Sequence, residues 1–228
     1  RITEVAKQPD GLLVSLNADG QASKLAAKML VGADGVWSAV RKSVRPTSSS
    51  RFTGELAWRT TIPLKGSAGE IFITVGKCDC VTTFLHDRFH LVAYPVSKGT
   101  RVNLVAFTQG ERMAETWSGN ADLSILKQAM RNTSPGLVSL VEASGPWTAW
   151  PLHDVDPKGS WTAPNIALIG DAAHAMTPFA AQGAAMAIED AASLAEAMAI
   201  GGSLPETLSQ WERQRKTRVG KVVRRGAL

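Results

Sequence analysis

The sequence predicts an α/β fold in which an incomplete Rossmann-like domain is interrupted by a mostly antiparallel sheet domain. Two short, fully apolar runs, residues 29–31 and 166–169, are typical of buried parallel strands, and each is followed by a turn that contains glycine and aspartate. Between them lie several strand-like runs of a different character. We therefore expect one domain formed by residues 1–46 and 150–228, and a second domain formed by residues 47–149.

Composition limits the class of protein. The 228 residues, 44% of them hydrophobic, suffice for one large domain or two small ones. The net charge of +5 is modest and most basic residues are scattered, which fits anionic small molecules and argues against nucleic-acid binding. Cys78 and Cys80 cannot form a disulfide framework and offer only half of a metal site, so we expect no metal and a reducing, cytoplasmic location. No stretch reaches the roughly 18 apolar residues that a membrane span needs.

The N-terminal part begins with a predicted β-hairpin. Leu12, Val14 and Leu16 recur at every second position, as in a half-buried strand. Residues 17–20, with the sequence Asn-Ala-Asp-Gly, supply turn chemistry, because Asn, Asp and Gly tolerate the backbone angles of tight turns. A returning strand is expected at residues 25–28.

The middle domain is predicted as a sheet of about five strands followed by two helices. Its strand-like runs are separated by connections that carry Gly, Lys, Asp and Arg, which favours antiparallel pairing. The predicted strands are residues 56–64, 70–75, 81–85, 90–96 and 102–107. The helical patterns lie at residues 122–131 and 135–143, and residues 147–152 are consistent with a further strand.

Two helices are predicted near the C-terminus. The first begins near Gly183 and is stopped by the glycines at 201–202. Its predicted apolar stripe consists of Ala184, Ala187, Ile188, Ala191, Leu194, Ala195 and Met198. The second helix should run from about Pro205. Its basic residues between Arg213 and Arg225 are interpreted as a solvated helix face, with an anion site as the alternative.

The strongest candidate site is the stretch that starts with Gly170 and Asp171. A buried strand places this carboxylate at its C-terminal end, where ligands bind in open α/β sheets and where it can accept hydrogen bonds from ligand hydroxyls. A loop with Pro178 then leads into a helix whose first residues, Gly183 and Ala184, are small. The N-terminus of this helix can stabilise an anion. For Asp171 alone, a strand-loop-helix unit that merely packs well is the alternative.

Two weaker candidates lie upstream. Asp34 follows the first apolar run in a Gly-rich turn, and Arg41 on the next helix can pair with a phosphate or with Asp34. Alone, this Asp-Gly pair is only a turn signal. His90 and Tyr94 share one face of a predicted strand because side chains alternate, so both could line a pocket. An edge histidine and a core tyrosine are the alternative.

The two aspartate motifs resemble those of a known family. The stretch from Gly170 to Gly183 is similar to the flavin-contacting motif of the class A flavoprotein monooxygenases, the p-hydroxybenzoate hydroxylase group, and residues 31–41 are similar to the Asp-Gly motif of the same family. The resemblance implies that Asp171 binds the ribityl part of FAD. It also implies that the backbone of Ala181, Gln182, Gly183 and Ala184 points at the isoalloxazine ring, and that Asp34 lies beside the pyrophosphate and affects NAD(P)H use.

The pair His90 and Tyr94 narrows the resemblance to one group within this family. Salicylate-hydroxylase-like members, including 3-hydroxybenzoate and 6-hydroxynicotinate hydroxylases, show a His-x-x-x-Tyr similar to that of His90 and Tyr94. This implies that His90 acts as general base at the hydroxyl of a small phenolic or aromatic-acid substrate. The implied reaction is an NAD(P)H- and FAD-dependent monooxygenation with O₂ through a flavin C4a-hydroperoxide. Flavin-dependent epoxidases, ubiquinone-type hydroxylases and halogenases share the two flavin motifs and are the alternatives within this class.

One part of the family pattern is missing. The family opens with a βαβ unit that carries Gly-x-Gly-x-x-Gly, and this sequence contains no such motif. We therefore expect a fragment, a processed chain or a renumbered one, in which the two parallel strands lack a central neighbour. The alternative function is a truncated, non-catalytic module. The expected protein partners are a second copy, in a homodimer, or a missing N-terminal segment.

Overall fold

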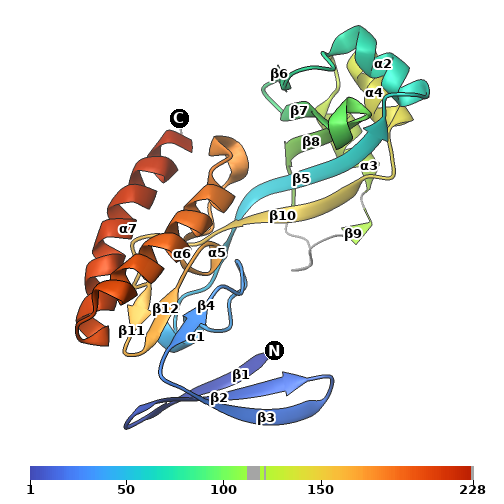
Figure 1. The fold of residues 1–228 in the computed structure, drawn as a ribbon. Coiled ribbons are helices and arrows are strands. Elements are labelled where there is room, and N and C mark those ends of the chain that lie inside the picture. The colour runs from blue at the N-terminus through green and yellow to red at the C-terminus, as the bar shows by residue number, and fades with distance from the viewer. Residues whose placement is uncertain (112–118, 121, 227–228) are drawn as a thin grey trace. The chain divides into compact units, whose positions relative to one another are not determined.

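The chain forms two compact units (Figure 1). The computed structural model describes residues 1–111, 119–120 and 122–226. The first unit comprises Arg1–Arg51 and His153–Leu228, and the second comprises Phe52–Leu152. The sequence places the corresponding boundaries at residues 46/47 and 149/150. Among the described residues, no helix is long and apolar enough to span a membrane.

The first unit begins with a three-stranded antiparallel sheet of order β1-β2-β3. Its strands are β1 (Ile2–Gln8), β2 (Gly11–Ala18) and β3 (Gln21–Ala27). The predicted hairpin is confirmed as β2 and β3, and its turn is fixed where the Gly20 N–H donates to Asn17 Oδ1 at 3.1 Å. Leu12 and Val14 are buried on one face of β2, as their alternation predicts. Strand β1, which precedes the hairpin, is an addition to the prediction.

The second sheet of this unit brings the two apolar runs together. Its order is β11-β12-β4, from β11 (Thr162–Ala163), β12 (Ile166–Leu168) and β4 (Leu30–Gly32). Strands β12 and β4 are parallel, which confirms the predicted buried parallel strands. The expectation that they lack a central neighbour is wrong, because they pair directly, with Ile166 opposite Leu30. Gly32 allows this close packing, since a Cβ there would lie 2.8 Å from side-chain atoms of Leu168 and Val40.

Five helical segments complete the described part of the first unit. They are α1 (Arg41–Val44), α5 (Asp171–His174), the 3₁₀ turn η2 (Pro178–Ala180), α6 (Gly183–Ile200) and α7 (Leu204–Gly226). Helices α6 and α7 lie side by side (Figure 1). Helix α6 begins at Gly183 and ends at Ile200, where Gly201 caps it, as the sequence predicts.

The predicted apolar stripe of α6 is largely wrong. The helix buries Met186, Asp190 and Leu194, whereas Ile188 of the predicted stripe is 71% exposed. The helix is rich in alanine on all sides, so hydrophobic periodicity distinguishes its faces poorly. Asp190 also makes the buried face hard to predict, because a charged residue is rarely buried unless it has a partner.

The second unit is a sheet covered by helices on one face. The sheet order is β6-β7-β8-β5-β10-β9, and the pairs β6-β7, β7-β8, β8-β5 and β10-β9 are antiparallel. Its strands are β5 (Arg51–Pro63), β6 (Thr82–Leu85), β7 (Phe89–Val96), β8 (Arg101–Gln109), β9 (Gly119–Asn120) and β10 (Thr148–Asp154). The helices are α2 (Ser67–Val75), α3 (Leu123–Ala129) and α4 (Pro135–Ala143), and the 3₁₀ turn η1 spans Ser97–Gly99. Core side chains of the sheet, such as Leu91 and Leu104, pack with Phe72 and Leu140 of the helices.

One predicted strand of this unit is a helix. Residues 70–75 belong to α2, although Ile71, Ile73 and Val75 are β-branched and favour a strand. Phe72 is fully buried, and Ala68 lies one turn before it on the same helix face. The spacing of Ala68, Phe72 and Val75 is therefore helical, and packing against the core overrides the local propensity.

Candidate functional site

The two aspartate motifs meet at a hollow in the first unit. This hollow has a volume of about 580 Å³, and its wall is formed by the loop after β4, the turn after β12, η2 and the first turns of α6. Among the predicted site residues, those that line it are Gly170, Asp171, Pro178, Ala181, Gly183 and Ala184. Ala33 and Gly35, on either side of Asp34, line it as well. The parallel pairing of β4 with β12 explains the meeting, because both strands end at the same edge of the sheet.

The turn after β12 depends on Gly170. Its backbone has φ +57° and ψ −141°, a conformation that is open mainly to glycine. A Cβ at this position would also lie 3.0 Å from the Cβ of Ala187 on α6. The next residue, Asp171, begins α5 and is exposed, so its carboxylate can contact a molecule in the hollow.

The start of α6 forms the opposite part of the wall. Ala181 is in the left-handed conformation with φ 50°, and Gln182, the N-cap residue, makes no side-chain capping bond. The first N–H groups of a helix have no partner within the helix. A Cβ at Gly183 would have no atom of the described residues within 4 Å, which leaves room beside the backbone. This helix end can therefore approach a ligand closely and stabilise negative charge on it.

Asp34 and Arg41 have other partners than expected. The Asp34 carboxylate accepts hydrogen bonds from Ser38 Oγ at 2.5 Å and from the Ala39 N–H at 2.7 Å, so it caps its own loop. Of the two partners considered for Arg41, Asp34 forms no ion pair with it among the described residues. Arg41 is 2% exposed and donates to the carbonyls of Ala172 at 3.0 Å and Val36 at 2.7 Å.

These contacts give Arg41 a structural position between the two motifs. Burial, and next the positive charge of Arg45, hold the pKa of Arg41 below its ordinary value, while Asp34 acts in the opposite direction. Arg45 makes a parallel connection, since its Nη2 donates to the Ala173 carbonyl at 2.8 Å. The two arginines thus tie the segment after Asp34 to α5, and Arg41 does not appear among the described residues that line the hollow.

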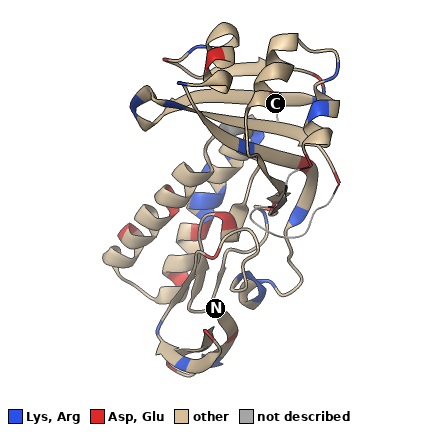
Figure 2. Ribbon diagram, turned by 90° about the vertical axis from the view of Figure 1, so that its right-hand side faces the viewer, with Lys and Arg blue, Asp and Glu red and all other residues tan. Residues whose placement is uncertain are grey.

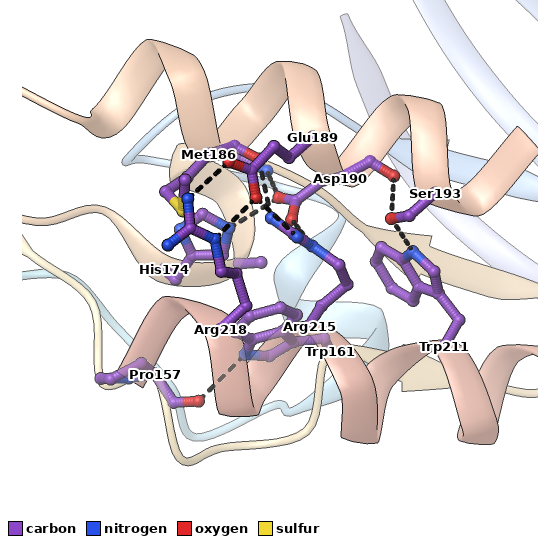
Figure 3. Close-up of polar contacts among 12 residues, drawn as sticks. Pro157, Trp161, His174, Met186, Glu189, Asp190, Ser193, Trp211, Arg215 and Arg218 are labelled. Carbon is purple, nitrogen blue, oxygen red and sulfur yellow. Dashed lines mark hydrogen bonds and ion pairs between the residues drawn. The ribbon is translucent and has the colours of Figure 1, made fainter. Parts of the chain in front are cut away.

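Behind the hollow lies a buried ionic network that the sequence did not reveal (Figure 3). The Asp190 carboxylate, 0% exposed, contacts His174 Nε2 at 2.6 Å and Arg215 Nε at 2.8 Å. Burial raises the pKa of Asp190, but hydrogen bonds from His174, from the Gly170 N–H and from Arg215 outweigh it, so the pKa lies below its ordinary value. Interpreting the basic residues of α7 as solvated is therefore wrong for Arg215. The available signal was the spacing of Met186, Asp190 and Leu194, which repeats every four residues.

The other predicted residues, His90 and Tyr94, belong to the second unit. Both lie on the face of β7 that is turned away from the helices, because Phe89, Leu91 and Ala93 fill the core. Phe107 lies opposite His90 in the sheet, and Asn103 lies opposite Tyr94. His90 is exposed and Tyr94 is half-buried.

His90 also lines a smaller hollow of about 170 Å³, with Glu55, Arg88, Phe107 and Gln109. Burial raises the pKa of Glu55, and the nearby His90 opposes this shift. The structure therefore brings His90 next to a carboxylate. Tyr94 shares its sheet face but is not among the described residues that line this hollow.

Other classes of site find less support. Within the described ranges, no group of three His, Cys, Asp or Glu residues is arranged to hold a metal ion. Cys78 and Cys80 are free thiols. Lys and Arg residues are spread over helices, strands and loops of both units (Figure 2).

Comparison with known proteins agrees with the two motifs. The family model described as an FAD binding domain matches residues 9–226, and the chain therefore belongs to this family. The predicted membership in the FAD-dependent monooxygenases is confirmed, since the relatives are enzymes of this kind.

The relatives are aromatic hydroxylases. The chain is 29% identical to a 3-hydroxybenzoate 6-hydroxylase of Polaromonas naphthalenivorans (strain CJ2), with 95% of this chain and 52% of the relative covered. It is 31% identical to a salicylate hydroxylase of Pseudomonas putida, with 98% and 55% covered. A crystal structure of Klebsiella pneumoniae HpxO complexed with FAD and uric acid matches at a TM-score of 0.82 and 27% identity, over 99% of this chain and 56% of that one. The chain thus spans about half the length of the relatives it matches.

The residues around the hollow fit the flavin-bearing half of FAD. An exposed carboxylate at Asp171 suits the hydroxyls of a ribityl chain, and the uncapped start of α6, with open space at Gly183, suits a flat ring that accumulates negative charge. The Gly-x-Gly-x-x-Gly turn that would hold the pyrophosphate is not in this sequence. The fit therefore concerns the ribityl and ring portions.

Proposed function

We propose that this chain provides the flavin- and substrate-contacting part of an NAD(P)H- and FAD-dependent monooxygenase that hydroxylates a small phenolic or aromatic-acid substrate. The observation that carries the proposal is the hollow of about 580 Å³, on which both aspartate motifs and the start of α6 converge. Two relatives of the chain, a 3-hydroxybenzoate 6-hydroxylase and a salicylate hydroxylase, support this substrate class.

In this proposal the first unit holds and orients the cofactor. Asp171 accepts hydrogen bonds from ribityl hydroxyls, and the N–H groups at Gly183 and Ala184 face the ring edge that gains negative charge on reduction. Asp34 acts indirectly, by fixing the loop that contributes Ala33 and Gly35 to the wall. When bound, FAD would take electrons from NAD(P)H and activate O₂ for insertion into the aromatic ring.

In this proposal the second unit supplies the residue that accepts the substrate proton. His90 accepts the proton of the substrate hydroxyl, and the substrate oxygen then donates electron density to the aromatic ring. The neighbouring Glu55 stabilises the imidazolium that results. Tyr94, on the same sheet face, is assigned to substrate orientation through its hydroxyl. This assignment makes His90 a catalytic residue and Tyr94 a binding residue.

A non-catalytic fragment is the second candidate function. It is favoured by the missing Gly-x-Gly-x-x-Gly unit and by the chain's span of about half its relatives. The two functions differ in the retention of flavin. The purified chain should carry a yellow chromophore, or acquire one with added FAD, if it holds the cofactor. A chain that stays colourless at saturating FAD would favour the fragment.

The catalytic role of His90 has a separate test. His90→Ala should lower hydroxylation of a hydroxybenzoate much more than it lowers FAD affinity, because His90 and the hollow belong to different units. Thr83→Ala is a control in the same sheet, since Thr83 is an exposed residue of the neighbouring strand β6 and does not line the His90 hollow. Equal turnover of His90→Ala and the unmodified chain would contradict the role of His90.

A further inference from the structure

We propose that Asp190 is the positioning residue of the flavin hollow, acting through Gly170 and His174 to set the distance between the hollow's two walls. The inference rests on the proposed function, because it assigns the hollow to a flavin. Asp190 itself lies behind the wall and is not among the described residues that line it.

The geometry of the Asp190 carboxylate carries the proposal. Oδ2 accepts from the Gly170 N–H at 2.8 Å and contacts His174 Nε2 at 2.6 Å, while Oδ1 accepts from Arg215 Nε at 2.8 Å. The three donors come from the turn after β12, from the end of α5 and from α7. Only an ionised carboxylate can accept from all three, since an amide in its place would present N–H groups to one of them.

His174 is held in one orientation by these contacts. Because the Asp190 carboxylate is an acceptor, the imidazole must donate from Nε2. Its Nδ1 is buried and has no hydrogen-bond partner among the described residues, so the contact through Nε2 is the hydrogen bond that orients the ring. The ring of Trp161 packs against the imidazole, with centroids 4.7 Å apart (Figure 3). The end of α5 is thus fixed from both sides.

The consequence concerns Asp171, the predicted ribityl contact. Asp171 lies between Gly170 and His174 in the chain, so the Asp190 carboxylate holds the residues on both sides of it. Asp190 also belongs to α6, seven residues after Gly183, which forms the opposite wall. A single side chain therefore connects both walls, and its loss should let the Gly170 turn move away from α6.

The remaining partners explain how this charge is kept in the interior. Arg215 supplies the opposite charge from α7, and its Nη1 also contacts Glu189 at 2.9 Å. Glu189 in turn contacts Arg218 at 2.8 Å, in a more exposed layer (Figure 3). A buried charge that keeps its partner is tolerated, whereas one that loses it is strongly destabilising. The test must therefore separate the positioning of the hollow from the stability of the unit.

The test compares Asp190→Asn with a variant in which both charges are removed. Asp190→Asn keeps the size of the side chain but loses one acceptor. Asp190→Leu/Arg215→Met removes the ion pair entirely and keeps the unit folded even if the single variant does not fold, since replacing a buried pair by apolar groups is often tolerated. The matched control is Ser193→Ala, one turn further along α6, which breaks the bonds of Ser193 Oγ with Trp211 Nε1 and with the backbone carbonyl of Asp190 but leaves the contacts of the Asp190 carboxylate in place.

The first readout is amide hydrogen exchange over residues 170–174, measured without cofactor. We expect exchange in the folded Asp190 variants to be faster by about 10- to 100-fold, as for the loss of a hydrogen bond to a buried charge, and to be unchanged in Ser193→Ala. Unchanged exchange in a folded Asp190 variant would overturn the proposal.

The second readout is FAD affinity at a temperature where each variant is folded. The Asp190 variants should bind FAD at least about tenfold more weakly, and Ser193→Ala should match the unmodified chain. Equal affinity of the folded double variant and the unmodified chain would overturn the positioning role. If the unmodified chain binds no FAD, the proposed function fails, and hydrogen exchange alone then decides whether Asp190 positions the hollow.

Discussion

Replacing Arg215 by methionine tests whether the buried Asp190 carboxylate depends on its ion pair. Arg215 Nε lies 2.8 Å from Asp190 Oδ1, and the two side chains are 8% and 0% exposed. Arg215→Met leaves the carboxylate with its bonds to Gly170 and His174 but without an opposite charge. Removing one partner of a buried ion pair costs about 3–5 kcal/mol. With a urea dependence of about 1–3 kcal/mol per molar, the unfolding midpoint should fall by at least about 1 M.

Arg218 provides the matched comparison on the same helix. It follows Arg215 by three residues and contacts Glu189 at 2.8 Å, but these side chains are 44% and 36% exposed. Water and salt screen such a pair, so Arg218→Met should shift the midpoint by only a small fraction of the Arg215→Met shift. Asp190→Leu combined with Arg215→Met should restore most of the lost stability, because no unpaired charge is left.

The assay must follow the first unit separately, because a chain with two units need not unfold in one step. Urea unfolding monitored by hydrogen exchange and mass spectrometry does so, since peptides from α6 and α7 report on the first unit alone. Equal midpoints for Arg215→Met and Arg218→Met would refute the reasoning. A double variant no more stable than Arg215→Met would refute it as well.

Three further predictions follow from individual residues. Gly170→Ala should destabilise the first unit by about 1–3 kcal/mol in urea unfolding, because it forces a side chain into φ +57° and against Ala187; Gly183→Ala, which meets no atom within 4 Å, should not. The pKa of Glu212 lies below its ordinary value of 4.5, because hydrogen bonds from Lys216, Thr162 and the Trp161 N–H outweigh burial. Position 212 therefore binds a proton more readily in the unfolded chain, so the unfolding free energy should fall as pH drops below about 4.5. The unfolding free energy of the Glu212→Gln variant should fall less steeply over the same pH range. His90→Gln should lower hydroxylation of a hydroxybenzoate and leave the thermal unfolding midpoint unchanged, since His90 is exposed; a large midpoint shift would contradict this.

The elements that form the hollow could be predicted because their signals are local. A short apolar strand followed by glycine and aspartate has few other interpretations, and both such strands are found in one parallel pair. The start of α6 at Gly183 and its stop before Gly201 were predicted from glycines and from the small residues around them. In each case neighbouring residues in the chain determine the conformation.

The buried network could not be predicted because its partners are distant in the sequence. Asp190 and Arg215 are 25 residues apart, and each looks like a surface residue of its own helix. The same limitation explains Arg41, whose carbonyl acceptor at Ala172 is 131 residues away. Helix α2 was mistaken for a strand because β-branched residues outnumber the two core positions, Ala68 and Phe72, that decide its packing.

Titration of the ¹⁵N-labelled chain with FAD, followed by amide chemical shifts, tests the flavin hollow most directly. If both aspartate motifs and α6 hold the cofactor, the amides of Gly35, Gly170, Asp171, Gly183 and Ala184 should shift together with one saturation curve. Asp171→Ala should weaken that curve. Saturable binding that shifts amides elsewhere and leaves these five unchanged would contradict the account.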